Sequence, residues 1–356
     1  MFHVDDCKIS HASKSVVDQL LKQQSDRFGK ETPLTITHGD VHDYLGMTID
    51  FSIRGKVKFY MFDYIGQILM EAGPSNDPSA TPAGSNLFRV NPNAEKLSTQ
   101  EGDQFHRSVA QLLFLSKRAR PDLQTAVAFL CSRVKSPDVD DAKKLARVMR
   151  HLRATVFLPL VLGWDGTGNI YWSVDASFAV HNDMKSHTGG VMTLGSGALI
   201  AMSTKQKLNT TSSTEAELVG VSDSMPFNMW CTYFFKAQGQ EVGEGNIVVG
   251  KRNVLYQDNE SCIKLAKNGK SSSTKRTRHI HIRYFAITDR VKNKEIEIHY
   301  CPTEDMLGNF YTKPVQGDLY KKFWNSILGV TQDDCFRYEE EYKEAKAKST
   351  SSQSMD

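Results

Sequence analysis

The N-terminal part of the chain alternates between helical and strand-like patterns. Apolar residues recur at helical spacing from Val16 to Phe28, and Gly29 follows, which predicts a helix over about 13–28. The segments HDYLGMTIDF and KVKFYMF alternate apolar and polar positions on either side of Arg54-Gly55, which predicts a hairpin of two strands. A helix over 63–72 completes an α+β unit, which ends at Gly73-Pro74.

The next 80 residues change from an irregular to a helical pattern. Residues 73–103 are rich in Pro, Ser, Asn, Gly and Thr, which predicts an extended connection. Helices are then expected over 105–117 and 122–134, with a break at Pro121 between them. A third helix over 138–155 has acidic residues in its first turn and basic residues in its last, in agreement with the helix dipole.

From about residue 160 the pattern indicates a mixed α/β unit that ends near Lys313. The aromatic residues Trp230, Tyr233 and Phe234 stand at core spacing in its longest helix, so we expect them to be packed. The polar segment 343–356 is predicted to be a disordered tail. The expected strands are LVLGW, IYWSVDA, GGVMTL, ALIAMST, NVLYQD and IEIHY, and the expected helices cover 213–237 with a kink at Pro226, 260–267 and 277–292.

Composition and charge place the chain among soluble globular proteins. Hydrophobic residues make up 40% and charged residues 24% of its 356 residues, and the formal net charge is +3. Six scattered cysteines without a CxxC pair favour reduced thiols over disulfides or a zinc site. The sequence shows neither an apolar run of about 18 residues nor a signal peptide. We therefore predict an intracellular protein, cytoplasmic or nuclear, without a targeting signal.

Three acidic residues stand at the ends of predicted elements. Asp175 lies on an apolar strand, Glu217 lies one turn into a long helix, and Asp258 ends a strand that a helix follows. An acid at the tip of a buried strand is costly unless a partner such as a cation compensates its charge. Many acids occur in a chain of this length, so the order of these three is suggestive and does not decide the matter.

Longer segments around these acids resemble a known family. In order and spacing they are similar to the ribonuclease H domain of copia-type retrotransposon Pol polyproteins, over roughly residues 165–315. The resemblance implies a ribonuclease H-like mixed sheet flanked by helices, and it places Asp175, Glu217 and Asp258 on the carboxylates that bind Mg²⁺, with Mn²⁺ as an alternative. The implied reaction is endonucleolytic cleavage of RNA in an RNA–DNA hybrid. The matching segments are VDASFA, KSHTGGVMTLGSGALIAMSTKQK, SSTEAELVGVSD, YQDNESCIKLAKN, RTRHIHIRYFAITDRV and IHYCPTEDMLGNFYTKP.

The N-terminal part resembles the reverse transcriptase of the same polyprotein. FHVDDCKISH is similar to the catalytic hairpin of the polymerase palm, so Asp5 and Asp6 correspond to its two aspartates. The chain begins inside that palm, so we expect no DNA synthesis unless another polypeptide supplies the missing N-terminal part. The expected organisation is a truncated palm (1–73), a linker (74–103), a helical thumb or connection remnant (104–157), a ribonuclease H-like domain (158–315) and a C-terminal extension with a disordered tail (316–356).

The fourth carboxylate of the family is altered. The family stretch LADxxTK reads LGNFYTK here, so Asn309 takes the position of the acid and Gly308 precedes it. An amide oxygen can still face a cation but adds no charge, and Gly308 weakens a helix by up to about 1 kcal/mol. Asp305 is a weaker candidate for a replacement ligand. Two interpretations stay open, an active nuclease and an inactive nucleic-acid-binding relic; an integrase or exonuclease is disfavoured by SSTEAEL and by the absence of an HHCC region.

Two basic groups are candidate contacts for nucleic acid. Lys205 and Lys207 precede the helix that carries Glu217, where free backbone N–H groups could hold phosphates. An ordinary capped helix start with solvated lysines explains them equally well. A basic, aromatic-containing helix could follow the backbone of a hybrid, against the alternative of a solvated face. Its cationic candidates are Lys275, Arg276, Arg278 and Arg283.

Overall fold

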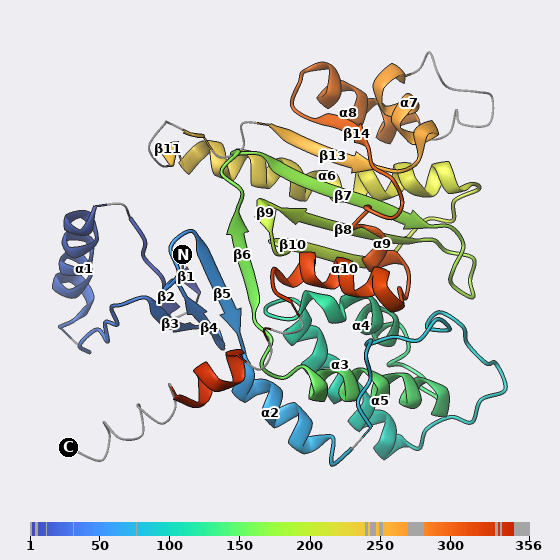
Figure 1. Ribbon diagram of the computed structural model, residues 1–356, viewed down its shortest axis with the longest axis horizontal. Coiled ribbons are helices and arrows are strands. Elements are labelled where there is room, and N and C mark those ends of the chain that lie inside the picture. Colours follow the sequence, from blue (N-terminus) through green and yellow to red (C-terminus); the bar gives the residue numbers. More distant parts are fainter. Residues whose placement is uncertain are drawn as a thin grey trace.

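The computed structural model shows a mixed α/β protein in which two sheets are joined by helices (Figure 1). Within the described part, no helix has the length and apolar character needed to cross a membrane. The predicted tail after residue 344 and the four residues Asp5, Lys275, Arg276 and Arg278 lie outside the described residues. The structure describes residues 2–3, 6–11, 13–30, 32–75, 77–238, 241–242, 247–248, 252–269, 281–331, 334 and 337–344.

The N-terminal part contains the predicted first helix, the hairpin and the second helix. The hairpin differs from the prediction, because HDYLGMTIDF folds back on itself and forms two strands. Leu45 and Gly46 turn between them with φ of 54° and 75°, a left-handed pair that closes a tight turn. The elements are β1 (Phe2–His3), β2 (Asp6–Cys7), α1 (Lys14–Phe28), β3 (Val41–Tyr44), β4 (Met47–Asp50), β5 (Lys56–Tyr60) and α2 (Phe62–Glu71).

A helical unit follows the irregular connection, and its helices share one apolar core with α2. The first helix begins six residues earlier than predicted, because Ser98 and Glu101 form a capping box that satisfies backbone N–H groups at its start. Asp138 and Asp141 cap the third helix in the same way. The elements are α3 (Thr99–Ser116), η1 (Pro121–Leu123), α4 (Gln124–Cys131) and α5 (Val139–Ala154).

The central sheet has the strand order β10-β8-β7-β13-β14. Its first three strands are antiparallel neighbours, β13 runs parallel to β7, and β14 runs parallel to β13. Because helices cover both faces, β7 is buried almost along its whole length. The strands are β7 (Ile170–Ser177), β8 (His187–Thr193), β10 (Ile200–Lys205), β13 (Asn253–Gln257) and β14 (Glu297–Tyr300).

Helices pack on the two faces of this sheet through alternating residues of β8. Met192 belongs to the core beneath the long helix α6, whereas Val191 belongs to the core beneath the C-terminal helices. Pro226 lies inside α6, as predicted. The helices are α6 (Ser213–Gln238), α7 (Glu260–Asn268), α8 (His281–Lys292), α9 (Asn309–Thr312) and α10 (Gly317–Leu328).

The prediction that the aromatic residues of α6 are packed is wrong. Trp230, Tyr233 and Phe234 are 61%, 51% and 42% exposed. The helix instead turns Leu218 and Met229 toward the sheet, so the aromatic residues remain on its outer face. Helical spacing alone does not say which of two apolar faces is buried.

A second sheet crosses the boundary that we expected at residue 158. Its order is β3-β4-β5-β6-β9, with antiparallel neighbours throughout, and it pairs β5 with β6 (Leu160–Trp164). The short β9 (Gly195–Ser196) closes its other edge. The segment 41–60 is therefore joined by backbone hydrogen bonds to the beginning of the predicted ribonuclease H-like unit. A separate pair is formed by β11 (Glu241–Val242) and β12 (Ile247–Val248).

The helix α10 was not predicted and joins the helical unit to the central sheet. Its apolar residues Tyr320, Phe323, Trp324 and Ile327 follow helical spacing and are buried. Trp324 Nε1 donates to Asp122 Oδ2 over 3.1 Å, inside a buried ion pair between Asp122 and an arginine of the same turn. The C-terminal extension is thus a structural element of the core, at least up to Leu328.

Candidate metal centre

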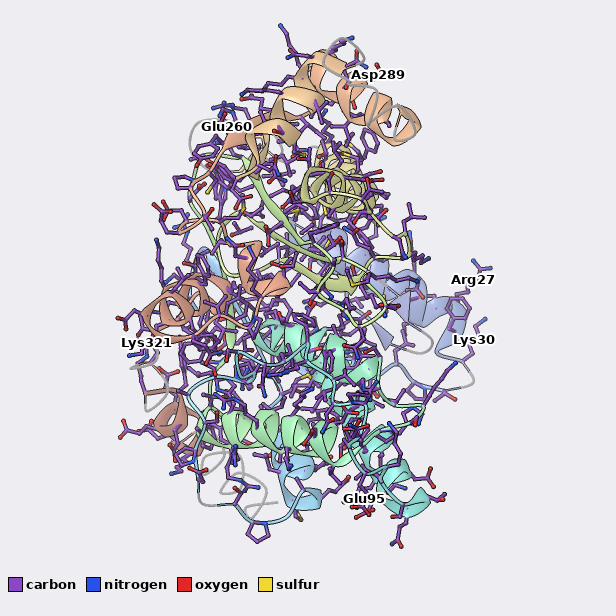
Figure 2. All side chains as sticks on the ribbon, turned by 90° about the vertical axis from the view of Figure 1, so that its right-hand side faces the viewer. Arg27, Lys30, Glu95, Glu260, Asp289 and Lys321 are labelled. Atoms are coloured by element: carbon purple, nitrogen blue, oxygen red, sulfur yellow. The ribbon has the colours of Figure 1, made fainter. Side chains whose placement is uncertain are left out.

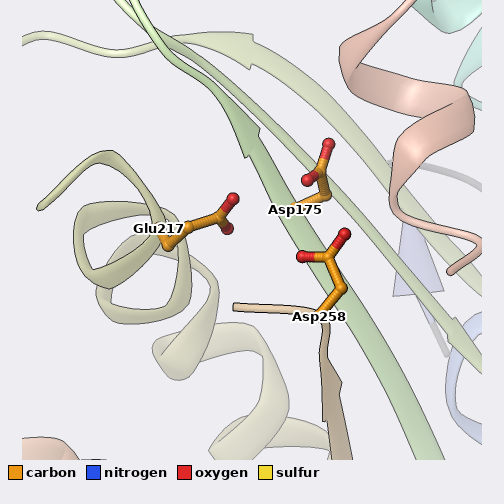
Figure 3. A group of neighbouring side chains, drawn as sticks. All are labelled: Asp175, Glu217 and Asp258. Atoms are coloured by element: carbon orange, nitrogen blue, oxygen red, sulfur yellow. The ribbon is translucent and has the colours of Figure 1, made fainter. Parts of the chain in front are cut away.

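Three carboxylates from separate elements converge at one edge of the central sheet (Figure 3). Asp175 comes from β7, Asp258 follows β13, and Glu217 comes from the second turn of α6. Because β7 and β13 are parallel neighbours, their carboxyl ends meet at the same edge. One oxygen of each carboxylate lies within 4.8 Å of the other two. The structure therefore brings the three predicted acids together.

Burial and mutual repulsion perturb these acids. Asp175 and Glu217 are 2% and 5% exposed, and Asp258 is half-buried. Burial, followed by the charges of Asp175 and Asp258, raises the pKa of Glu217 well above its ordinary value. Burial and the charge of Asp175 also raise the pKa of Asp258. Such a group favours a proton or a cation over three free negative charges.

Neighbouring side chains fix the orientation of the carboxylates. Gln257 Nε2 donates to Glu217 Oε2 over 3.2 Å and to the carbonyl oxygen of Val174. Thr303 Oγ1 donates to Asp258 Oδ2 over 3.0 Å, and Thr312 Oγ1 donates to Asp175 Oδ2. The sequence analysis missed these three residues, although Gln257 directly precedes Asp258 and Thr312 lies in the LGNFYTK stretch that it examined.

The fourth position holds an amide whose two polar atoms are already engaged. Asn309 is buried, its Nδ2 donates to the carbonyl oxygen of Thr303 over 2.9 Å, and its Oδ1 accepts a hydrogen bond from Lys313. The ammonium of Lys313 also lies 3.3 Å from Asp175 Oδ2. The ammonium of Lys313 thus contacts both Asn309 and Asp175. Asp305 lies outside the group of three acids and pairs with Lys322 instead.

Glycine allows α9 to approach the sheet at this point. A Cβ at Gly308 would lie 2.8 Å from the backbone nitrogen of Asp175, and a Cβ at Gly189 of β8 would lie 2.6 Å from the carbonyl oxygen of Gly308. Neither contact is tolerated by a real Cβ. Gly308 was expected to weaken a helix; the structure shows that it also permits a close approach of two backbones.

The predicted nucleic-acid contacts are described only in part. Lys205 ends β10 and pairs with Asp183 over 2.7 Å, so its charge is partly compensated inside the protein. Lys207 is exposed. Arg283 lies in α8 and Asp6 in β2, but the side chains of both are outside the described part.

About nine tenths of the chain is similar in sequence to known polyproteins. It is 26% identical over 331 residues to the retrovirus-related Pol polyprotein from transposon TNT 1-94 of Nicotiana tabacum. The match covers 90% of this chain and 24% of the tobacco protein. The chain is related to copia-type retrotransposon Pol polyproteins. The chain is also 25% identical over 337 residues to the Pol polyprotein from transposon RE1 of Arabidopsis thaliana, and this match covers 93% of this chain and 22% of that protein. The chain described here therefore spans about a quarter of the length of these two polyproteins.

Two further comparisons add less. No protein-family model matches the chain. A foamy viral protease-reverse transcriptase, solved in complex with an RNA/DNA hybrid, is similar with a TM-score of 0.45 and 10% sequence identity, over 83% of this chain and 34% of that one. A TM-score this low does not establish a common fold.

Proposed function

We propose that this Pol relative cleaves the RNA strand of RNA–DNA hybrids in a reaction that depends on Mg²⁺ or Mn²⁺. The observation that carries the proposal is the convergence of Asp175, Glu217 and Asp258 within 4.8 Å of one another. Three acids that are far apart in sequence gain nothing from such proximity in the absence of a cation. Two carboxylates at the ends of neighbouring strands and one on a crossing helix are the arrangement that the resemblance implies.

The donor set suits Mg²⁺. All three ligands are hard carboxylate oxygens, without a histidine or thiolate in the group. The raised pKa of Glu217 is the expected signature of a site whose negative charge lacks compensation. When bound, Mg²⁺ would activate a water molecule and neutralise charge on the scissile phosphodiester.

The protein's own residues have separate tasks in this scheme. Asp175 and Asp258 would hold the cation at the sheet edge, and Thr303 donates a hydrogen bond to the carboxylate of Asp258. Glu217 would be the third ligand and would orient a water molecule toward the phosphodiester. Gln257 positions Glu217 through its amide N–H and thereby couples β13 to α6. The order and directions of the five strands of the central sheet support a ribonuclease H-like fold for this unit.

The remaining parts are assigned by resemblance to the same polyproteins. We propose that the segment 1–73 corresponds to part of a reverse transcriptase palm, 74–103 to a linker, 104–157 to a thumb or connection, 158–315 to the nuclease unit and 316–356 to a C-terminal extension. The helix α2, at the end of the proposed palm segment, packs in one apolar core with α3 to α5 of the helical unit. The pairing of β5 with β6 links the proposed palm segment to the nuclease unit.

A second function is favoured by one specific observation. The fourth position holds the neutral Asn309 instead of an acid, so no negative charge at this position balances the ammonium of Lys313, which lies beside Asp175. A site of this kind binds divalent cations more weakly than one with four acids. The competing proposal is therefore a protein that binds RNA–DNA hybrids without cleaving them.

A cleavage assay with three proteins separates the two proposals. A labelled RNA–DNA hybrid is incubated with Mg²⁺ or Mn²⁺ and the wild type, Asp258→Asn or Glu260→Gln. Glu260 is the matched control, since it lies two residues beyond Asp258 and its exposed carboxylate pairs with Lys264, away from the group. We expect cleavage by the wild type and the control and its loss in Asp258→Asn. Equal background cleavage by all three proteins would remove the nuclease proposal and leave the binding protein.

A further inference from the structure

The long helix α6 has a second apolar face, which points away from the central sheet. Phe227, Trp230, Tyr233 and Phe234 lie on this face and are between 42% and 61% exposed. In Figure 1, α6 lies behind the central sheet, so its outer face belongs to the surface of the molecule. We call these four residues the aromatic face. Exposed apolar patches of this kind mark interaction sites.

The exposed positions of α6 follow the spacing of a helix that packs against another helix. They recur at intervals of alternately three and four residues, which is the repeat by which two helices pack along their length. Between positions 223 and 235, the remaining residues of α6 are buried or half-buried. The pattern extends over about 20 Å of helix. Its exposed positions are Asp223, Pro226, Phe227, Trp230, Tyr233, Phe234 and Ala237.

Polar contacts on the opposite face fix the rotation of α6 on the sheet. Asn228 Nδ2 donates to Asn253 Oδ1 over 2.9 Å, and Asn253 Nδ2 donates to Thr232 Oγ1 over 2.9 Å. These three side chains are buried. A rotation that turned the aromatic face inward would leave their polar groups without partners, at a cost of about 1–3 kcal/mol for each group. The aromatic face therefore stays outside while α6 is docked on the sheet.

The rings of the aromatic face are held in place before any partner binds. Trp230 and Phe234 stack with their centroids 5.3 Å apart and their planes inclined by 16°. Arg290 Nη1 of α8 donates to the hydroxyl oxygen of Tyr233 over 3.2 Å. The helix α8 contacts α6, and its Asp289 is labelled in Figure 2. Side chains that are already ordered lose less entropy on association, and Trp and Tyr are prominent among the residues that dominate interface energies.

The charges at the two ends of the aromatic face are complementary to those of a second copy of the chain. Asp223 lies seven positions before Trp230, Lys236 lies six positions after it, and both are exposed. If two α6 helices pair antiparallel about a twofold axis beside Trp230, Asp223 of each copy lies opposite Lys236 of the other. Parallel pairing would place like charges opposite each other. Opposite charges across an interface favour the antiparallel arrangement.

The area of the aromatic face suits self-association of moderate affinity. An aromatic side chain buries about 150–250 Å², so four rings that are roughly half exposed offer about 300–500 Å². Two copies would bury about 600–1,000 Å² through these rings, and the flanking exposed residues bring the total to the roughly 1,000 Å² of a specific interface. With one acid and one lysine at its ends, the face lacks the excess of positive charge that attracts a polyanion.

We propose that the aromatic face is the interface of a symmetric homodimer in which two α6 helices pack antiparallel, with Trp230 next to the twofold axis. The rings of one copy cover those of the other, and two pairs of Asp223 with Lys236 close the ends. The same helix carries Glu217, but that side chain is buried on the face toward the sheet and takes no part in the interface. The inference therefore does not depend on the proposed nuclease activity.

Sedimentation velocity of the full-length chain, from micromolar to submillimolar concentrations, tests the dimer. The wild type is compared with Trp230→Lys, which would place two ammonium groups next to the twofold axis, and with Phe28→Ser. Phe28 is the matched control, because it is an aromatic residue of similar exposure (54%) on α1, which lies apart from α6 in Figure 1. Its neighbour Arg27 is labelled in Figure 2. Thermal unfolding of each variant verifies that its fold is retained.

Charge reversal tests the antiparallel arrangement. Asp223→Lys and Lys236→Asp each place like charges opposite each other in the proposed dimer, so each variant alone should associate more weakly than the wild type. An equimolar mixture of the two variants restores both pairs, because the new ammonium of one variant faces the new carboxylate of the other. We expect the mixture to associate as the wild type does, which would also show that both variants are folded.

The outcomes separate a homodimer from other occupants of the face. We expect the wild type to change from monomer to dimer over this range, Trp230→Lys to associate roughly tenfold or more weakly, and Phe28→Ser to match the wild type. A wild type that stays monomeric, equal association of Trp230→Lys, or a mixture that associates no better than its components overturns the proposal. Tryptophan quenching by a single-stranded oligonucleotide in a monomeric wild type, lost in Trp230→Lys, would overturn it in favour of nucleic acid. Because no cation is needed, failure of the nuclease assay leaves these results unaffected.

Discussion

The altered fourth position makes Asn309→Asp the most informative substitution. In the wild type, Asn309 Nδ2 donates to the carbonyl oxygen of Thr303 over 2.9 Å, and Lys313 donates to Asn309 Oδ1. An ionised aspartate cannot donate to Thr303, so one carboxylate oxygen is left facing a carbonyl oxygen. In exchange, the variant adds a fourth negative charge next to Asp175 and restores the acid that the family resemblance implies.

These two effects have opposite signs and depend on the cation. Loss of this hydrogen bond lowers the free energy of unfolding by about 0.5–1.5 kcal/mol in EDTA, because the carbonyl oxygen of Thr303 keeps only the longer bond from the backbone N–H of Met306. With a cation present, a carboxylate ligand that tightens binding on the order of tenfold contributes about 1.4 kcal/mol of additional stabilisation at saturation. Asn309→Asp should therefore be less stable than the wild type without Mg²⁺ and should regain most of the difference with it.

Thermal or urea unfolding with EDTA and with Mg²⁺ or Mn²⁺ measures both effects, and hybrid cleavage is recorded in parallel. Asn309→Ala is the matched control, since it loses the same hydrogen bond without gaining a charge. We expect cation-dependent recovery and increased cleavage only in the aspartate variant. If the aspartate and alanine variants respond equally to the cation, position 309 does not face the cation and the reasoning is refuted.

Three further substitutions test neighbouring features. Lys313→Met removes an ammonium 3.3 Å from Asp175, so calorimetry should show Mn²⁺ binding on the order of tenfold tighter, with Lys322→Met unchanged. Burial lowers the pKa of His187 from 6.5 to about 3. Between these pH values the unfolded chain binds more protons than the folded protein. The free energy of unfolding should therefore fall as the pH decreases below 6.5, by up to about 1.4 kcal/mol per pH unit. Urea unfolding should show a shallower pH dependence for His187→Gln, and equal slopes would contradict this assignment. Gly308→Ala should lower stability by at least about 1 kcal/mol in urea unfolding, because its Cβ would lie 2.8 Å from the backbone nitrogen of Asp175.

The three acids could be predicted because each stands at a position that sequence patterns define well. Asp175 lies near the C-terminal end of the apolar strand β7, Asp258 directly follows the apolar strand β13, and Glu217 follows a helix start within the motif SSTEAEL. Their convergence then requires that β7 and β13 are parallel neighbours and that α6 packs against β7. Local patterns combined with these two features of the fold bring the side chains together.

Other features depend on contacts that no local pattern contains. The apolar residues of α10 from Tyr320 to Ile327 follow helical spacing, so the helix itself could have been predicted from the sequence. Its contact with Asp122 could not, because the two partners are 202 positions apart. Pairing of β5 with β6 likewise joins strands that are separated by the whole helical unit. The exposed side of α6 shows the same limit, because burial of Trp230 could be judged only with the opposing elements in place.

The position of Gly308 shows how one residue has different meanings in a sequence and in a fold. In the sequence, Gly308 is a poor helix former that precedes Asn309, the altered fourth ligand, which favoured the interpretation of an inactive protein. In the structure, its missing Cβ lets α9 contact the backbone of Asp175, and Gly189 provides the complementary space on β8. This close approach places Lys313 and Asn309 next to Asp175. The amide Asn309, where the resemblance implies an acid, therefore stands in a closely packed site, so Asn309→Asp is a meaningful test of function.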